Sequence, residues 1–131
     1  MNEKQIQNNI MREFSTRMEM RLWRQNVGKA VPASFLNIVK SKLLGGDLQE
    51  ALRLLESPPV ISFGVKGQAD LSGILKTGHR LEIEVKTDTG KQSKDQEIFQ
   101  KVIESKNGCY ILARSVDDVQ TGINSFLFRR A

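Results

Sequence analysis

The sequence contains few of the side chains that build disulfide frameworks, zinc sites and histidine-based catalytic groups. Its 131 residues include one Cys and one His, so neither a disulfide framework nor a zinc site can be built within a single chain. It also lacks an apolar run near the roughly 20 residues that cross a bilayer, and the polar residues after Met1 do not form a signal-peptide core. We therefore expect a small cytoplasmic protein of a reducing compartment, with no membrane partner.

The remaining composition is that of an ordinary globular chain, with 39% hydrophobic and 27% charged residues. The length suits one compact domain. Twenty Lys and Arg residues against fifteen Asp and Glu residues give a net charge of +5, and these charges are spread evenly along the chain. Such an excess permits nucleic-acid binding without demonstrating it.

Hydrophobic periodicity and turn residues predict an α/β domain with a mixed sheet. The expected order is helix, strand, two helices, three strands, helix, strand, helix. Strands are predicted within residues 22–24, 60–65, 69–75, 81–86 and 109–113. The first helix has an apolar stripe of Ile6, Ile10, Phe14 and Met18.

The strand predicted at 81–86 alternates between apolar and charged residues, so its charged side chains share one face. Burying the apolar positions of this strand and the preceding one together sets their register. The expected pairs are Leu75 with Leu81, Ser72 with Glu84, and Asp70 with Lys86. This brings Asp70, Glu84 and Lys86 onto one surface, and Glu82 is expected to be solvated on the same face.

Two carboxylates beside an ammonium group suit a Mg²⁺ site, because Mg²⁺ prefers oxygen ligands. Asp70 and Glu84 would supply carboxylate oxygens, and the Val85 carbonyl could add a backbone ligand. Lys86 could orient a metal-activated water and stabilise developing charge. The alternative is a solvated strand face with a cross-strand salt bridge.

Six short motifs carry a resemblance to a known family. They are Arg24-Gln25-Asn26-Val27-Gly28, Phe63-Gly64, Gly67-Gln68-Ala69-Asp70, Glu84-Val85-Lys86, Ser93-Lys94-Asp95-Gln96 and Gly108-Cys109-Tyr110. In content and order they resemble the VRR-NUC (virus-type replication-repair nuclease) domain of the PD-(D/E)XK nuclease superfamily. The resemblance covers nearly the whole chain, although Ala69 stands where many members carry Pro.

The resemblance implies a single restriction-endonuclease-like domain over residues 1–131, with a central mixed sheet flanked by helices. It further implies a DNA endonuclease that depends on Mg²⁺ or Mn²⁺. The family's metal-binding aspartate falls on Asp70, its Glu-x-Lys pair on Glu84 and Lys86, and its helical glutamine on Gln96. Residues 29–59 form a helical insertion beyond the minimal domain, which could set substrate choice or build a dimer interface.

Two of these residues have competing structural explanations. Gln96 could return a hydrogen bond to the Ser93 amide as part of a helix cap, or it could act in the site. The family's first-helix acidic residue falls on Glu3, with Glu13 further along the helix as the fallback. Glu3 could equally complement the helix dipole.

Standalone members of this family resemble junction-resolving enzymes, so the expected substrate is Holliday-junction or other branched DNA. Cutting two strands needs two sites, which predicts a homodimer. The host would be a bacterial cell, with the protein encoded by the bacterium or by a phage. The alternatives are a catalytically silent nuclease-like DNA-binding module and a structural or anti-repressor phage protein without a metal.

Overall fold

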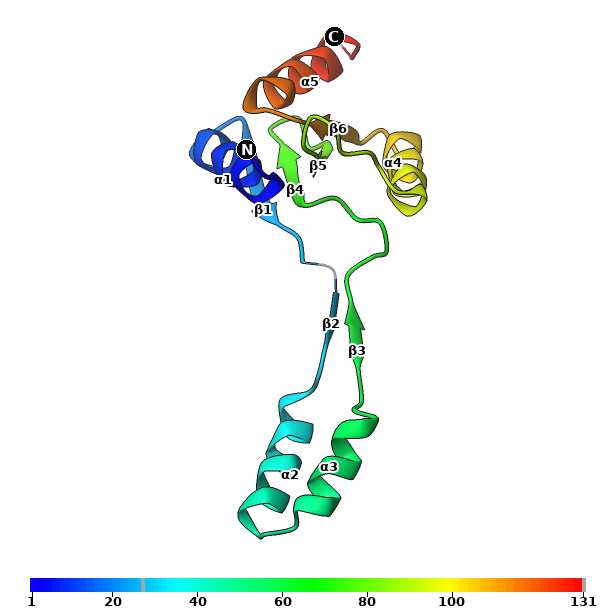
Figure 1. The fold of residues 1–131 in the computed structure, drawn as a ribbon. Coiled ribbons are helices and arrows are strands. Elements are labelled where there is room, and N and C mark those ends of the chain that lie inside the picture. Colours follow the sequence, from blue (N-terminus) through cyan, green and yellow to red (C-terminus); the bar gives the residue numbers. More distant parts are fainter. Residues whose placement is uncertain (27, 131) are drawn as a thin grey trace. The chain divides into compact units, whose positions relative to one another are not determined.

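A computed structural model describes residues 1–26 and 28–130, so Val27 of the Arg24–Gly28 motif lies outside the described residues. The described residues form five helices and six strands (Figure 1). In chain order these are α1 (Glu3–Phe14), β1 (Met20–Arg24), β2 (Gly28–Ala30), α2 (Ala33–Leu44), α3 (Leu48–Glu56), β3 (Ile61–Phe63), β4 (Leu71–Leu75), β5 (Arg80–Val85), α4 (Lys94–Ser105), β6 (Cys109–Ala113) and α5 (Val116–Phe128). Over these ranges, no helix has the length and apolar character that crossing a membrane requires.

The chain divides into two compact units, which are described separately. Unit 1 comprises Met1–Asn26 and Val65–Ala131, and unit 2 comprises Val27–Gly64. The predicted insertion at residues 29–59 lies within unit 2. The predicted α/β class is confirmed, and the order of elements differs from the expected one by the additional short strand β2.

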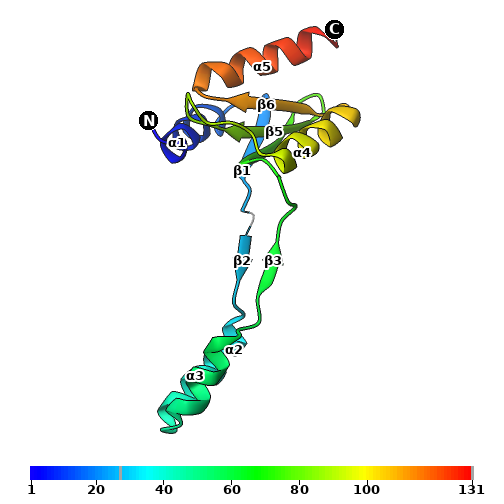
Figure 2. The ribbon, with the colours of Figure 1, turned by 45° about the vertical axis from the view of Figure 1, so that its right-hand side comes forward.

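Unit 1 is built on a four-stranded mixed sheet with the strand order β1-β4-β5-β6. The β1–β4 and β4–β5 pairs are antiparallel, whereas β5 and β6 are parallel and are connected through α4. Helices α1 and α5 pack with one face of the sheet to form the main core. Figure 2 shows α5 and α4 on opposite sides of the sheet. Helix α4 packs against β6 from the other face. There the Phe99 and Tyr110 rings meet edge to face, with 6.5 Å between their centroids.

The structure confirms three of the four residues predicted for the apolar stripe of α1. Ile6, Ile10 and Phe14 are buried in the main core, and Asn2 caps the helix by accepting a hydrogen bond from the Gln5 amide. Met18 was wrongly placed in the stripe: it is 95% exposed. The helix ends at Phe14, so the 3.6-residue period no longer directs Met18 toward the core.

The register between β4 and β5 differs from the prediction by two residues. Ser72 pairs with Glu82, not with Glu84. The turn is tighter than expected: the Leu75 amide donates to the His79 carbonyl at 2.9 Å, and Gly78 adopts a φ of 88° that favours glycine. A shift of two residues keeps every side chain on its predicted face, so the charged face survives while its partners change.

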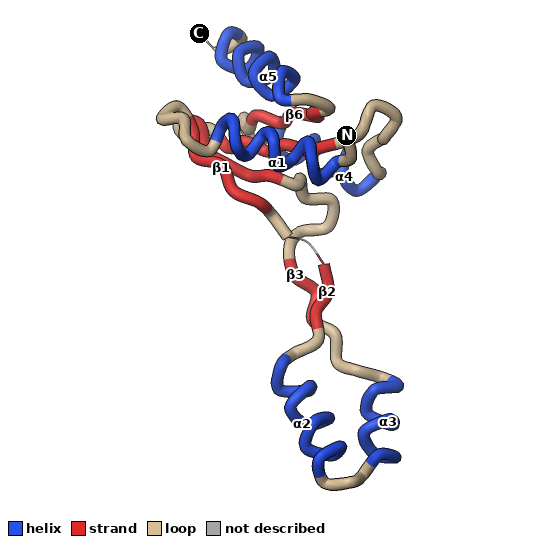
Figure 3. Tube along the Cα trace, turned by 60° about the vertical axis from the view of Figure 1, so that its left-hand side comes forward, coloured by secondary structure: helices blue, strands red, loops and turns tan. Residues whose placement is uncertain are grey.

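Unit 2 contains an antiparallel ribbon of β2 and β3 and two antiparallel helices, α2 and α3. Figure 3 shows the two helices side by side, joined by a short turn. Asp47 caps α3 by accepting from the Glu50 amide at 3.1 Å. The core of this helical hairpin is small: its buried residues are Phe35, Val39 and Ala51, with Leu54 packed against them.

Candidate active site

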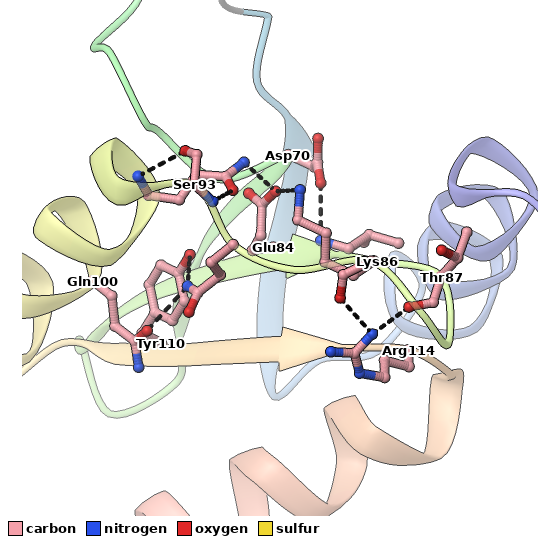
Figure 4. A network of polar contacts seen from close by, with 12 residues as sticks. Asp70, Glu84, Lys86, Thr87, Ser93, Gln100, Tyr110 and Arg114 are labelled. Atoms are coloured by element: carbon pink, nitrogen blue, oxygen red, sulfur yellow. Dashed lines mark hydrogen bonds and ion pairs between the residues drawn. The ribbon is translucent and has the colours of Figure 1, made fainter.

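The candidate site lies on the sheet face opposite the main core, where β4 begins and β5 ends. Asp70 directly precedes β4, Glu84 is the second-to-last residue of β5, and Lys86 directly follows that strand. Helix α4 begins beside them (Figure 4). The structure thus brings together Asp70, Glu84, Lys86 and Gln96, the four residues expected to be catalytic.

Backbone contacts fix the position of Asp70. Its Oδ2 accepts a hydrogen bond from the Val85 amide at 2.8 Å, and its carbonyl accepts one from the Gln25 amide at 2.8 Å. Burial of this half-buried carboxyl raises its pKa, and the negative charge of Glu3 adds to the increase. The Val85 hydrogen bond and the Lys86 charge act in the opposite direction.

Glu84 is nearly inaccessible, with 2% of its surface exposed. Its Oε1 accepts from Gln96 Nε2 at 2.6 Å and lies 3.2 Å from Lys86 Nζ. Its Oε2 is buried and has no hydrogen-bond partner among the described residues. Burial, followed by the neighbouring Asp70 charge, raises the pKa of Glu84 to about 7 despite the opposing hydrogen bond and charge of Lys86.

Gln96 performs both of the roles considered from the sequence. Its Oε1 accepts from the Ser93 amide at 2.8 Å, while the Ser93 hydroxyl accepts from the Gln96 amide at 3.2 Å. This capping box begins α4. The Nε2 end of the same side chain donates to Glu84, so one amide group connects the start of the helix to the buried carboxylate.

Sterics require a glycine at position 67, the first residue of the Gly67–Asp70 motif. Gly67 adopts a φ of 79°, and a Cβ at this position would collide with the backbone carbonyl of Asp95. Glycine is therefore required for the segment before Asp70 to pass against the first turn of α4. The Lys66 ammonium also lies 3.4 Å from the Asp95 carboxylate at the surface.

Glu82 was wrongly expected to be solvated, because its side chain is completely buried. Its Oε2 accepts from the Ser72 hydroxyl at 2.7 Å, and its Oε1 accepts from Arg80 Nε at 2.6 Å. The shifted register supplies the Ser72 partner. Both Glu82 oxygens are therefore satisfied by protein groups, whereas Glu84 retains one that is not.

A second network holds the loop that follows Lys86. Arg114 Nη1 donates to the Thr87 carbonyl and, at 2.9 Å, to the Gly90 carbonyl (Figure 4). Gln92 Nε2 donates to the Tyr110 hydroxyl at 3.1 Å. Sequence reasoning missed Arg114, because its partners are backbone carbonyls that leave no recognisable residue pattern.

The two first-helix acidic residues have different surroundings. Glu3 opens α1, and its charge raises the pKa of both Asp70 and Glu84. Glu13 is about 15 Å further along the helix and pairs with Arg17 at 2.6 Å. Within residues 1–26 and 28–130, no three His, Cys, Asp or Glu side chains gather as a possible metal-ligand group.

The donor set nevertheless fits a hard divalent cation. Two carboxylates with raised pKa values provide the oxygen ligands that such ions prefer. One of them has a buried oxygen for which residues 1–26 and 28–130 supply no hydrogen-bond partner. A buried polar atom without a partner is costly, and a bound cation would remove that cost. Comparisons with protein-family models, with curated proteins and with solved structures gave no match to this chain.

Proposed function

We propose that the protein is a metal-dependent DNA endonuclease of the VRR-NUC type, with unit 1 as its PD-(D/E)XK restriction-endonuclease-like core. The single observation that carries the proposal is the buried Oε2 of Glu84, which has no hydrogen-bond partner in the part of the chain that the structure describes, in a site that also contains Asp70 and Lys86. A purely structural ion pair would leave no reason for this oxygen to remain unsatisfied, as the neighbouring Glu82 illustrates with its two partners.

Asp70 and Glu84 would hold Mg²⁺ or Mn²⁺, with the Val85 carbonyl as a backbone ligand and Glu3 as a further acidic group. When bound, such an ion acidifies a water molecule and neutralises charge on a phosphodiester. Both carboxylates must be ionised for this role, and the Lys86 ammonium supports ionisation of Glu84.

Lys86 would orient the attacking water and stabilise the negative charge that develops on the phosphate. Its ammonium already lies 3.2 Å from Glu84 Oε1, and 14% of its side chain is exposed, so it reaches both the carboxylate and the surface. Gln96 would hold Glu84 in position through its 2.6 Å hydrogen bond. Exposed Lys91 and Lys94 would contact phosphates of the DNA near the site.

The substrate we propose is branched DNA, with the Holliday junction as the leading candidate, cut by a homodimer in the cytoplasm of a bacterial cell. The similarity of standalone VRR-NUC proteins to junction-resolving enzymes supports this substrate. A junction is resolved by two cuts, and two identical sites related by a two-fold axis would place one cut on each strand.

The test is a cleavage panel of four-way junctions, flaps, nicked duplexes and linear duplexes, with Mg²⁺, with Mn²⁺ and with EDTA. We expect metal-dependent cleavage of branched DNA by the wild type and none by Asp70→Asn, whereas both proteins bind the junction. Asp117→Asn, which alters an exposed carboxylate of α5, is the matched control and should cut normally. Binding without cleavage by the wild type would refute the enzyme and leave a catalytically silent DNA-binding module.

A further inference from the structure

Besides Leu44 at the end of α2, unit 2 exposes five leucines that its own small core does not cover. They are Leu36 and Leu43 of α2, and Leu48, Leu52 and Leu55 of α3; we call them the leucine face. Each is between 48% and 55% exposed. The three leucines of α3 follow the i, i+4, i+7 spacing of a helix stripe that packs against another helix.

Helix geometry places both stripes on the same side of the hairpin. In α2 the leucines are rotated by about a quarter turn from the buried residues Phe35 and Val39, and in α3 by about a quarter turn from Ala51 and Leu54. Viewed along each helix from its N-terminus, the leucines are rotated from the buried residues in the same sense in both helices. Because the two helices are antiparallel and pack through their buried residues, this places both leucine stripes on the same side of the hairpin.

The charges of the two helices indicate what covers this face. Helix α2 carries Lys40 and Lys42 and no acidic residue, whereas α3 carries Glu50 and Glu56 with a single Arg. That residue, Arg53, is already paired with Glu50 at 2.5 Å. Helix geometry places Lys40 and Glu56 along the two outer edges of the leucine face, whereas Lys42 and Glu50 lie on the other side of the hairpin. A two-fold rotation that lays α2 over α3 of a second copy brings Lys40 of each copy to the edge that carries Glu56 of the other, which makes the face complementary to itself.

We propose that the leucine face is the dimer interface of this protein and that its partner is a second copy of the same chain. Two hairpins packed through this face would place α2 of one protomer against α3 of its partner. The result is a four-helix bundle with ten leucines, five from each copy, in its core. This assignment rests on the homodimer of the proposed function and adds the surface through which the two copies meet.

The chain offers a matched control on the other side of the hairpin. Ile38 of α2 is 51% exposed, close to the 49% of Leu52. Its rotation from Phe35 and Val39 has the opposite sense, so it lies away from the leucine face. Leu52→Glu and Ile38→Glu thus add the same charge at equally exposed apolar positions, and only the first change falls in the proposed interface.

The experiment measures the mass of the full chain in solution by light scattering and analytical ultracentrifugation, without DNA or metal. We expect 29.6 kDa for the wild type, twice the 14.8 kDa of one chain, the same mass for Ile38→Glu, and 14.8 kDa for Leu52→Glu. The dissociation constant should rise at least ~30-fold in Leu52→Glu and less in Leu52→Ala. Circular dichroism of each variant verifies that the helices remain folded.

A monomeric wild type would overturn the proposal, as would a dimer that survives Leu52→Glu or one that both glutamate variants dissociate. Asp70→Asn separates this result from the enzymatic one. It should remain dimeric while losing cleavage. An inactive wild type with an intact leucine-face dimer would count against the nuclease alone.

Discussion

Replacing Glu84 with glutamine should make the metal-free protein more stable while removing its proposed activity. In the folded protein, burial and the Asp70 charge raise the pKa of Glu84 from its ordinary value of 4.5 to about 7. The folded state therefore binds this proton more tightly than the unfolded chain does. The stability associated with the bound proton is fully present below pH 4.5, declines as the pH rises toward 7 and is lost above it.

The size of the effect follows from the two pKa values. One pKa unit corresponds to 1.36 kcal/mol, so the change from 4.5 to about 7 makes ionised Glu84 cost about 3 kcal/mol of unfolding free energy at pH 8. Glu84→Gln keeps the shape of the side chain and removes the charge. We expect the variant to be more stable than the wild type by up to about 3 kcal/mol at pH 8, and by much less at pH 5.

The assay is denaturant unfolding at pH 5 and pH 8 in EDTA. Glu82→Gln is the control, because Glu82 lies on the same strand and face but has both oxygens satisfied. It should lose stability, by about 1–3 kcal/mol. Added Mn²⁺ should stabilise the wild type and not Glu84→Gln. A Glu84→Gln protein no more stable than the wild type at pH 8 would refute the reasoning.

Three further predictions concern the surroundings of this carboxylate. Lys86→Met should lower the cleavage rate by ~10²–10⁴-fold at unchanged DNA affinity. It should also shift the pH–rate profile to higher pH, because Lys86 lowers the pKa of Glu84. A profile at the wild-type pH values in a rate assay would contradict this. Gly67→Ala should cost about 1–3 kcal/mol of unfolding free energy in denaturant titration, owing to its φ of 79° and the blocked approach to α4; wild-type stability would be the contrary result. Arg114→Ala should cost about 1–3 kcal/mol of unfolding free energy and speed proteolysis within residues 87–90. Equal proteolysis rates for the variant and the wild type would argue against a role of Arg114 in holding this loop.

The faces of the strands were predictable from the sequence, but the register of one pair was not. Alternation in β5 separates Ile83 and Val85 from Glu82 and Glu84 whatever the pairing partner is. A two-residue shift leaves this separation intact, and the choice between registers depends on the turn. The turn around Gly78 places Ser72 opposite Glu82, which is why the burial of Glu82 was missed.

Local motifs were predicted best where one helix turn contains all of the partners. The Ser93–Gln96 capping box needs only the spacing of two residues and formed as expected. The contact from Gln96 to Glu84 joins residues 12 positions apart, so it becomes visible only once β5 and α4 are packed together. The hydrogen bonds from Arg114 to the loop after Lys86 join residues that are still further apart in the sequence. They depend on the parallel pairing of β5 with β6.

The place at which unit 2 is inserted has a consequence for how the chain can vary. Strand β1 ends at Arg24, which pairs with Leu71 at the start of β4, and the Gln25 amide bonds to the Asp70 carbonyl. Unit 2 therefore occupies the position of a hairpin turn between two adjacent strands. The cost of closing such a loop grows only as the logarithm of its length. Insertions of very different sizes can occupy this position while the strand pair that holds Asp70 stays the same.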